Sequence, residues 1–227
     1  MIKFAGIRSD ELSLIIEHYP SRTFPEVSYE VIEVPGRDGD IVIPNGNFKN
    51  YRQTYSAFID SFDPEVQHYQ EVARKVSEWL LGNPGYQRLE DSYDPDFYRM
   101  AYYSGGSEFS NFFNTYGRGS IEFTCAPRRF YKDGEKPVSV TSSSRLINPS
   151  VFPADPIYEI SGSSITVNGN TMTFGSSGVI IDVEKHTAKT ALGVSVSVSS
   201  GTYESLRLGK TNTFGGTYTV TPRWWTL

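Results

Sequence analysis

Only one stretch of this 227-residue chain has the periodicity of an amphipathic helix, and this constrains the fold class more than any other feature. Apolar side chains at spacings of three and four residues form one stripe there: Val66, Tyr69, Ala73, Val76 and Leu80. Asp63 and Pro64 suit the start of this helix, and the Gly-Asn-Pro-Gly sequence of residues 82–85 suits its end. Elsewhere, short alternating or β-branched runs are separated by turn residues. The pattern predicts a mainly β protein with one helix packed on a sheet.

The composition changes near Lys136, which predicts a domain boundary. Residues 1–136 carry a net charge of −6 and hold 24 of the 32 Phe, Tyr and Trp residues. Residues 137–227 carry a net charge of +1, and 28 of these 91 residues are Ser or Thr. Because the two parts would have such different surfaces, we expect two domains, residues 1–136 and residues 137–227.

The segment from Ile32 to Ile43 predicts a hairpin with a charged, exposed tip. β-Branched residues on both sides supply strand character, and the turn between them reads Pro35-Gly36-Arg37-Asp38-Gly39. Proline fixes one backbone angle, and glycine permits the positive φ that a chain reversal requires. In the preceding strand, residues 29–34, neither face is cleanly apolar. That strand is therefore either a solvated edge or a surface that a neighbouring subunit covers.

The residue inventory argues against several functional classes. A formal charge of −5 and a pI near 5.3 do not favour sequence-specific nucleic-acid binding. Three His and one Cys, without paired spacing, predict no metal site and no cofactor. Neither a Gly-x-Ser-x-Gly elbow nor a Walker-type loop occurs, so we expect no catalytic residues and no enzymatic activity. No apolar run is long enough to cross a membrane, and the N-terminus lacks the apolar core of a signal peptide.

An acidic segment, residues 90–96, follows the strand after the helix. It contains four carboxylates, among them Asp91, Asp94 and Asp96. The spacing differs from that of an EF-hand loop and Pro95 interrupts it, so a solvated turn is favoured over a calcium site. A pair of glycosidase carboxylates is also disfavoured, because such residues face each other across a cleft.

Residues 137–227 contain many short strands with polar turns and no helical pattern, which predicts a β-sandwich. Asn168-Gly169, between two alternating runs, is the clearest hairpin signal in the chain. Trp224 and Trp225 point to opposite faces if the C-terminal segment is extended. Either one ring is exposed and stacks on a sugar, or both pack within the sandwich or against the first domain. An exposed ring would support a second hypothesis, a carbohydrate-binding module with an accessory domain.

These features together resemble the distal tail protein (Dit) family of siphophages and prophages of Gram-positive bacteria. That family typically has a strand, a Pro-Gly-Arg-Asp-Gly turn, one helix ending in Trp-Leu, an acidic Asp-Pro turn before an aromatic strand, and a strand closing in Phe-x-Cys-x-Pro. The matching residues follow in this order: Pro35–Gly39, Trp79-Leu80, Asp94-Pro95, Phe123, Cys125 and Pro127. They cover essentially residues 27–134. Residues 206–212 resemble the family's Leu-x-Pro-Gly-x-Asn loop, with Leu208 in place of proline.

The resemblance implies a structural virion protein at the distal end of a phage tail. The first domain would form a ring, a homo-hexamer, between the tail tube protein and a tail-tip protein that carries or resembles a lysin. The second domain, a galectin-like or carbohydrate-module-like sandwich, would dock a receptor-binding protein or an upper baseplate protein. The tape measure protein is a further candidate neighbour. No membrane and no sequence-specific nucleic acid is implied.

The resemblance also suggests roles for two sets of residues. The Pro35–Gly39 turn is expected at a contact between subunits or between rings; alternatively, its Arg and Asp pair with each other and only shape the turn. The negative charge of residues 1–136 suggests a second role. Some of Asp91, Asp94 and Asp96 are expected to face the channel through which DNA passes, because an acidic wall repels phosphate.

Overall fold

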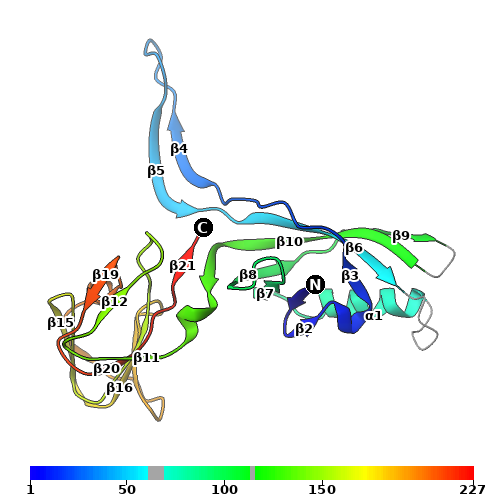
Figure 1. The fold of residues 1–227 in the computed structure, drawn as a ribbon. Helices are drawn as coiled ribbons and strands as arrows, with labels where there is room; N and C mark the ends of the chain where they lie inside the picture. The colour runs from blue at the N-terminus through cyan, green and yellow to red at the C-terminus, as the bar shows by residue number, and fades with distance from the viewer. Residues whose placement is uncertain (61–68, 113–115) are drawn as a thin grey trace. The chain divides into compact units, whose positions relative to one another are not determined.

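The computed structural model describes residues 1–60, 69–112 and 116–227 (Figure 1). It is mainly β, as the sequence predicted, and the described residues include one α-helix. The chain divides into two compact units, residues 1–129 with Leu227 and residues 130–226. The break falls within the last residues of strand β10 (Tyr116–Tyr131), so it comes a few residues before the predicted boundary at Lys136.

One large sheet makes up most of the first unit. Along its main path the strand order is β2-β1-β7-β8-β10-β6-β3, and β9 also pairs with β10. The strands are β1 (Ile2–Phe4), β2 (Ile7–Arg8), β3 (Leu14–Ile16), β6 (Tyr51–Asp60), β7 (Gln87–Asp91), β8 (Phe97–Tyr103), β9 (Phe109–Phe112) and β10. A 3-10 turn, η1 (Asp10–Leu12), precedes β3. β6 and β10 pair antiparallel from Tyr116 opposite Asp60 to Cys125 opposite Tyr51, and this long pairing forms the centre of the sheet.

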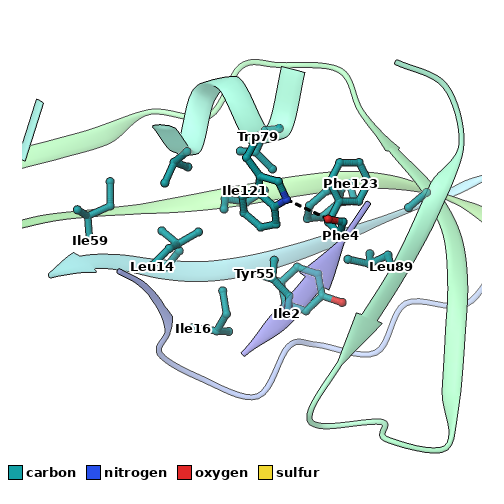
Figure 2. Packing of buried hydrophobic residues seen from close by; sticks show 14 of the residues in the cluster. Ile2, Phe4, Leu14, Ile16, Tyr55, Ile59, Trp79, Leu89, Ile121 and Phe123 are labelled. Atoms are coloured by element: carbon teal, nitrogen blue, oxygen red, sulfur yellow. Dashed lines mark hydrogen bonds between the residues drawn. The ribbon is translucent and has the colours of Figure 1, made fainter. Parts of the chain in front are cut away.

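The apolar residues of β6 and β10 alternate, so one face of the sheet is buried. On that face lie Tyr55, Ile59, Ile121 and Phe123, all fully buried. They form one cluster with residues of β1, β3 and β7, including Ile2, Phe4, Leu14 and Leu89 (Figure 2). Burial of side chains of this size stabilises a fold by about 1.5–3 kcal/mol each. This cluster is therefore the main source of stability in the first unit.

The helix α1 (Tyr69–Leu81) packs on the same cluster, as the sequence predicted. Tyr69, Val76 and Leu80 of the predicted stripe are buried, and Val72 and Trp79 are buried with them. The Trp79 indole donates a hydrogen bond to the Phe4 carbonyl at 2.9 Å, so the helix is fixed to β1 as well as packed on it (Figure 2). The predicted start of the helix, Asp63 to Val66, lies outside the described residues.

Strands β4 (Val27–Ile32) and β5 (Ile41–Phe48) form a two-stranded sheet of their own (Figure 1). We call residues 27–48 the hairpin arm. Asn45-Gly46-Asn47, a sequence typical of turns, lies inside β5. Two residues after the end of β5, the chain enters β6 of the large sheet.

The second unit consists of several small sheets, as expected of a sandwich-like domain. A five-stranded sheet has the order β11-β20-β13-β16-β17, a three-stranded sheet has the order β14-β15-β18, and β12 pairs with β19. The strands are β11 (Val138–Val140), β12 (Arg145–Ile147), β13 (Ile157–Ile160), β14 (Ser164–Val167), β15 (Asn170–Phe174), β16 (Val179–Asp182), β17 (Thr187–Thr190), β18 (Val198–Ser200), β19 (Thr211–Thr213), β20 (Tyr218–Thr221) and β21 (Trp225–Thr226). Two 3-10 turns, η2 (Lys132–Glu135) and η3 (Glu204–Leu206), complete the unit.

The hairpin predicted at Asn168-Gly169 is confirmed. Asn168 and Gly169 have φ values of 52° and 82°, and Val167 pairs with Asn170 across the two-residue turn. Positive φ at both central positions is the geometry of the primed turn that suits strand twist.

A backbone hydrogen bond in the loop of residues 206–212 explains why leucine, and not proline, can occupy position 208. The Leu208 N–H donates to the Ala154 carbonyl at 3.0 Å, and proline has no N–H to donate. At the end of this loop, Asn212 is buried, and its side-chain amide donates to the carbonyls of Leu146 and Gly209 at 3.1 and 2.9 Å. Asn212 thus ties the loop to β12.

Candidate functional site

The tip of the hairpin arm is a tight turn with the geometry that its sequence predicts. The Arg37 N–H donates to the Val34 carbonyl at 3.1 Å, which closes a four-residue turn. Pro35 occupies the second position and Gly36, with φ of 82°, the third, as in a type II turn. Gly39 also has positive φ, at 78°. Both glycines therefore hold conformations that other residues adopt only under strain.

The two charged residues of the tip are exposed. Arg37 and Asp38 both lie in a run of twelve exposed residues, 29–40. Within the described residues no ion pair joins their side chains, so the alternative that they pair with each other and only shape the turn has no support here. A guanidinium and a carboxylate on one tight turn remain available to a partner.

The hairpin arm exposes apolar side chains along its length. Seven of them have exposed fractions between 36 and 56%: Val27, Tyr29, Val31, Ile32, Val34, Val42 and Ile43. Val31 and Val42 are directly opposite each other in the ladder and therefore share a face. An isolated two-stranded hairpin is at best marginally stable, and several exposed apolar side chains on such a hairpin are typical of an interaction site. Of the two interpretations open at the sequence level, the uncovered apolar strand favours a surface that a neighbour covers.

A bulge lies near the base of the arm. Tyr29 pairs with Pro44 and Val27 pairs with Phe48, so β5 carries two more residues than β4 over this interval. The Asn45 amide donates to the Ser28 hydroxyl at 3.0 Å and bridges the interruption. Gly46 has φ of 74°, which explains why this turn-like sequence is accommodated inside a strand.

The acidic segment is not a freely solvated turn. Asp91 is only 5% exposed, and its carboxylate accepts hydrogen bonds from Arg99 Nη1 at 2.8 Å and from the Tyr55 hydroxyl at 2.9 Å. The Tyr93 N–H donates to its other oxygen at 3.0 Å. The expectation of a solvated turn is therefore wrong for Asp91, because β7 carries it inward between β1 and β8.

Asp94 joins the same cluster, whereas Asp96 does not. One oxygen of Asp94 accepts from Arg99 Nη2 at 3.1 Å and from Arg129 Nη1 at 3.0 Å. Asp96 is exposed. We call Asp91, Asp94, Arg99 and Arg129 the ion cluster.

The ion cluster shifts the titration of the groups around it. Burial lowers the pKa of Arg99, but Tyr55, Tyr51 and Asp91 outweigh that effect, and the pKa is raised. Burial raises the pKa of Tyr51 to about 12 and raises that of the Cys125 thiol to about 12. Cys125 is therefore a protonated, buried thiol rather than a nucleophile.

Sequence reasoning missed the two arginines of the ion cluster. Arg99 occupies an inward position of β8, two residues before the buried Ala101. An arginine on the buried face of a strand requires a carboxylate partner, and this signal was present in the alternation of residues 97–103. The sequence gives no comparable signal for Arg129. It is next to another arginine, Arg128, and only the folded structure shows that Arg129 is the one that contacts Asp94.

Neither tryptophan near the C-terminus offers an exposed ring. Trp224 and Trp225 are 6 and 5% exposed. The Trp225 ring stacks on Phe152 at a centroid distance of 4.7 Å, and its indole N–H donates to the Pro153 carbonyl at 3.0 Å. The Trp224 carbonyl accepts from the Tyr131 N–H at 2.9 Å. Sugar stacking requires an accessible aromatic face, so these two residues do not support the carbohydrate-module alternative.

Within the parts of the chain that the structure describes, no group of three or more His, Cys, Asp or Glu side chains is arranged to hold a metal ion. Among the same residues, no helix is both long and apolar enough to span a bilayer.

Comparison with known proteins identifies the fold. No protein-family model and no curated protein matches the sequence. Among solved structures, the chain is similar to the Dit protein (gp 19.1) of SPP1, described as a paradigm of the hub adsorption apparatus in phages that infect Gram-positive bacteria. The TM-score is 0.73, the sequence identity is 11%, and the alignment covers 96% of each chain. The resemblance inferred from the sequence is thus confirmed for the fold, across both units.

Proposed function

We propose that this chain is a structural protein of the distal end of a siphophage tail, a tail-tip or baseplate hub without enzymatic activity. The observation that carries the proposal is the hairpin arm, whose apolar residues are uncovered in a chain with the Dit fold. A neighbouring copy of the chain that packs on the arm would bury these residues. Repeated around an axis, the same contact closes a ring, and we propose a homo-hexamer.

The ring would join the tail tube protein on one face to the tail-tip protein associated with a lysin on the other. The second unit would dock a receptor-binding or upper baseplate protein, and the tape measure protein would end nearby. These partners come from the family resemblance. The protein would be synthesised in the host cytoplasm and would become part of the virion, at the distal end of the tail.

The Pro35–Gly39 turn would lie at a contact between subunits or between rings. Its support is the pair of exposed, opposite charges on a rigid turn. In a closed ring, Arg37 of one copy can meet Asp38 of another, which would fix the register of assembly more than its strength.

The channel proposal now rests mainly on Asp96. The carboxylates of Asp91 and Asp94 are already paired with arginines, which leaves them little free charge, whereas Asp96 is exposed. A wall carrying Asp96 and other exposed acids would repel DNA that passes through. A reconstruction of the assembled ring with a neutral or basic channel lining would refute this part of the proposal.

The first experiment is light scattering of the purified protein combined with negative-stain electron microscopy. The wild-type chain is expected to form six-membered rings, singly or in pairs. Val31→Asp/Val42→Asp places two charges on one face of the arm and is expected to give monomers with an unchanged melting temperature. Leu192→Asp is the matched control, because Leu192 is 92% exposed but lies in the second unit; it should leave the rings intact.

Charge reversal tests the tip. Arg37→Asp and Asp38→Arg are each expected to weaken ring formation, and the double exchange is expected to restore it if the two residues meet across an interface. A wild-type monomer that remains monomeric with tail tube and tail-tip proteins would overturn the hub proposal. In that event a glycan screen of the second unit becomes the next step.

A further inference from the structure

The ion cluster borders a cavity in the first unit. Its volume is about 140 Å³, and its lining includes Ser21, Arg22, Gln53, Asp94, Arg99 and Arg129. On this measure one water molecule needs about 10–15 Å³, so the cavity has room for a polyatomic ion with accompanying water.

Two buried donors at this cavity have no partner. The Nε atoms of Arg99 and Arg129 are buried and make no hydrogen bond. Both side chains are more than nine-tenths buried, with 7 and 8% exposed. A buried guanidinium N–H without an acceptor is costly, and such groups in native proteins usually signal a bound ion or water.

The charges around the cavity do not balance. Three guanidinium groups, those of Arg22, Arg99 and Arg129, face two carboxylates. Arg129 lies with its guanidinium 4.6 Å above the Phe97 ring, which partly compensates its charge. Burial nevertheless lowers the pKa of Arg129; Asp94 opposes this effect, and Arg22 and Arg99 lower the pKa further. Inside the cavity the guanidinium groups of Arg99 and Arg129 are matched by the two carboxylates, and the exposed Arg22 at its rim adds a third positive charge.

The outer wall of the cavity is held in place by polar and aromatic contacts. Gln53 Nε2 donates to the Ser21 carbonyl at 3.0 Å, and the Tyr19 ring lies 4.4 Å from that of Tyr93. The Tyr93 hydroxyl in turn donates to the Ile16 carbonyl at 3.3 Å. These contacts fix residues 19–22 over the arginines, with Arg22 at the exposed rim. A preorganised wall reduces the entropy cost of binding.

We propose that this cavity binds an oxyanion, a phosphate or a carboxylate, between Arg22 at the rim and Arg99 and Arg129 inside. An oxyanion offers several acceptor oxygens, so it can take hydrogen bonds from more than one guanidinium at once. It also places a negative charge beside three guanidinium groups in a partly desolvated site, where the attraction is stronger than in water.

The oxyanion has two sources with the same chemistry. It can be a free ion such as inorganic phosphate, or a carboxylate of the hairpin tip of a second copy, where Asp38 and Asp40 are exposed. The second source rests on the proposed ring; binding of phosphate by the isolated chain does not.

Titration calorimetry of the full chain with inorganic phosphate, at constant ionic strength, tests the site. The wild-type protein is expected to bind one phosphate saturably with a Kd of about 1 mM or below. Arg22→Ala, at an exposed position, should weaken binding about tenfold, as expected for one charge-assisted hydrogen bond. Arg129→Lys keeps the charge but removes the Nε donor and should weaken binding similarly. Arg145→Ala, an exposed arginine in the second unit, is the matched control and should change nothing.

Asp94→Asn gives a change of opposite sign. Removal of the competing carboxylate should tighten phosphate binding about tenfold, whereas mere damage to the fold would weaken it. Circular dichroism of every variant separates the two cases. Absence of saturable binding by the wild type, or an equal loss in Arg22→Ala and Arg145→Ala, would overturn the proposal and leave a water-filled cavity.

Assembly experiments distinguish the sources. If Asp40 of the hairpin tip supplies the carboxylate, phosphate should dissociate rings, and Asp40→Asn should weaken assembly while the isolated chain keeps its phosphate affinity. If the ion is free, phosphate should bind rings and monomers equally, and Asp40→Asn should assemble normally. A failure of the ring proposal would leave the phosphate titration unaffected, so the two proposals fail separately.

Discussion

The hairpin arm and the sheet from which it extends are built from the same kinds of residue, yet only the sheet buries them. Ile121 and Phe123 of β10 are fully buried against α1 and the neighbouring strands, whereas Val31 and Val42 of the arm are more than half exposed. The difference lies in neighbours, because β10 has strands and a helix around it and the arm is a ribbon of two strands. Strand propensity alone therefore does not indicate which strands stabilise the folded chain.

The same contrast holds for charge. Asp91 and Arg99 are held by each other within the sheet, while Arg37 and Asp38 at the tip face solvent. A buried ion pair gives little net stability but is costly to break, whereas an exposed charge is nearly neutral until a partner arrives. Substitutions in the sheet should therefore lower the free energy of unfolding far more than substitutions in the arm.

The largest effect is expected from Asp91→Ala. It leaves Arg99 buried without its nearest carboxylate and should cost about 3–5 kcal/mol in the free energy of unfolding. Urea denaturation measures the loss, and Asp38→Ala at the tip is the matched control, expected within about 0.5 kcal/mol of wild type. A loss below about 1 kcal/mol for Asp91→Ala would mean that the ion cluster is not the tightly coupled unit described here.

A matched pair of isoleucines gives the next effect. Ile121→Ala opens a cavity in the core and should cost about 2–5 kcal/mol, whereas Ile43→Ala in the arm should cost less than about 0.5 kcal/mol. Both are measured by urea denaturation at a protein concentration where the chain is monomeric. Equal losses at the two positions would show that the arm belongs to the same cooperative core.

Alkaline pH should destabilise the sheet through its buried thiol. Because burial raises the pKa of Cys125 from 9.0 to about 12, the folded state keeps a proton that the unfolded state loses. Stability is thus fully present below pH 9 and falls as pH rises towards 12, by about 1.4 kcal/mol at pH 10. Denaturation at several pH values measures this, and Cys125→Ala should delay the decline until Tyr51, with its own raised pKa, begins to contribute. An unchanged pH profile in Cys125→Ala would refute the assignment.

The smallest effect on global stability is expected at the bulge. Gly46→Ala forces a residue with a Cβ atom into positive φ and should cost about 1 kcal/mol within the arm. Hydrogen exchange should quicken for the amides of β4 and β5, while the most protected amides of β10 should not change. Slower exchange in the arm, or faster exchange in β10, would contradict the separation of the two regions.

Local chemistry was sufficient to predict the turns and the helix. Pro35-Gly36 and Asn168-Gly169 reverse the chain as their preferred φ values require, and Tyr69, Val76 and Leu80 face the core because their spacing matches the helical repeat. In each case the relevant interactions lie within a few residues in the sequence.

What the sequence did not reveal depends on pairing between distant segments. Leu89 pairs with Arg99, and this register brings Asp91 beside an arginine eight residues away that no local pattern connects to it. Burial of both Trp224 and Trp225 likewise follows from packing against Phe152 and its neighbours, not from the alternation of a strand. The anion cavity had no sequence signal, because its walls come from five separate segments.

β5 carries two extra residues at the bulge, an even number. This number determines on which face of the arm each side chain beyond the bulge lies. Side chains in a strand alternate with a period of two, so a single inserted residue would exchange the inner and outer faces of everything beyond it. Two inserted residues leave the faces unchanged. Val31 and Val42 therefore lie on the same face of the arm as the pair Val27 and Phe48, as they would in a hairpin without the bulge. A bulge of even size can therefore bend the arm without changing which side chains its outer part presents on each face.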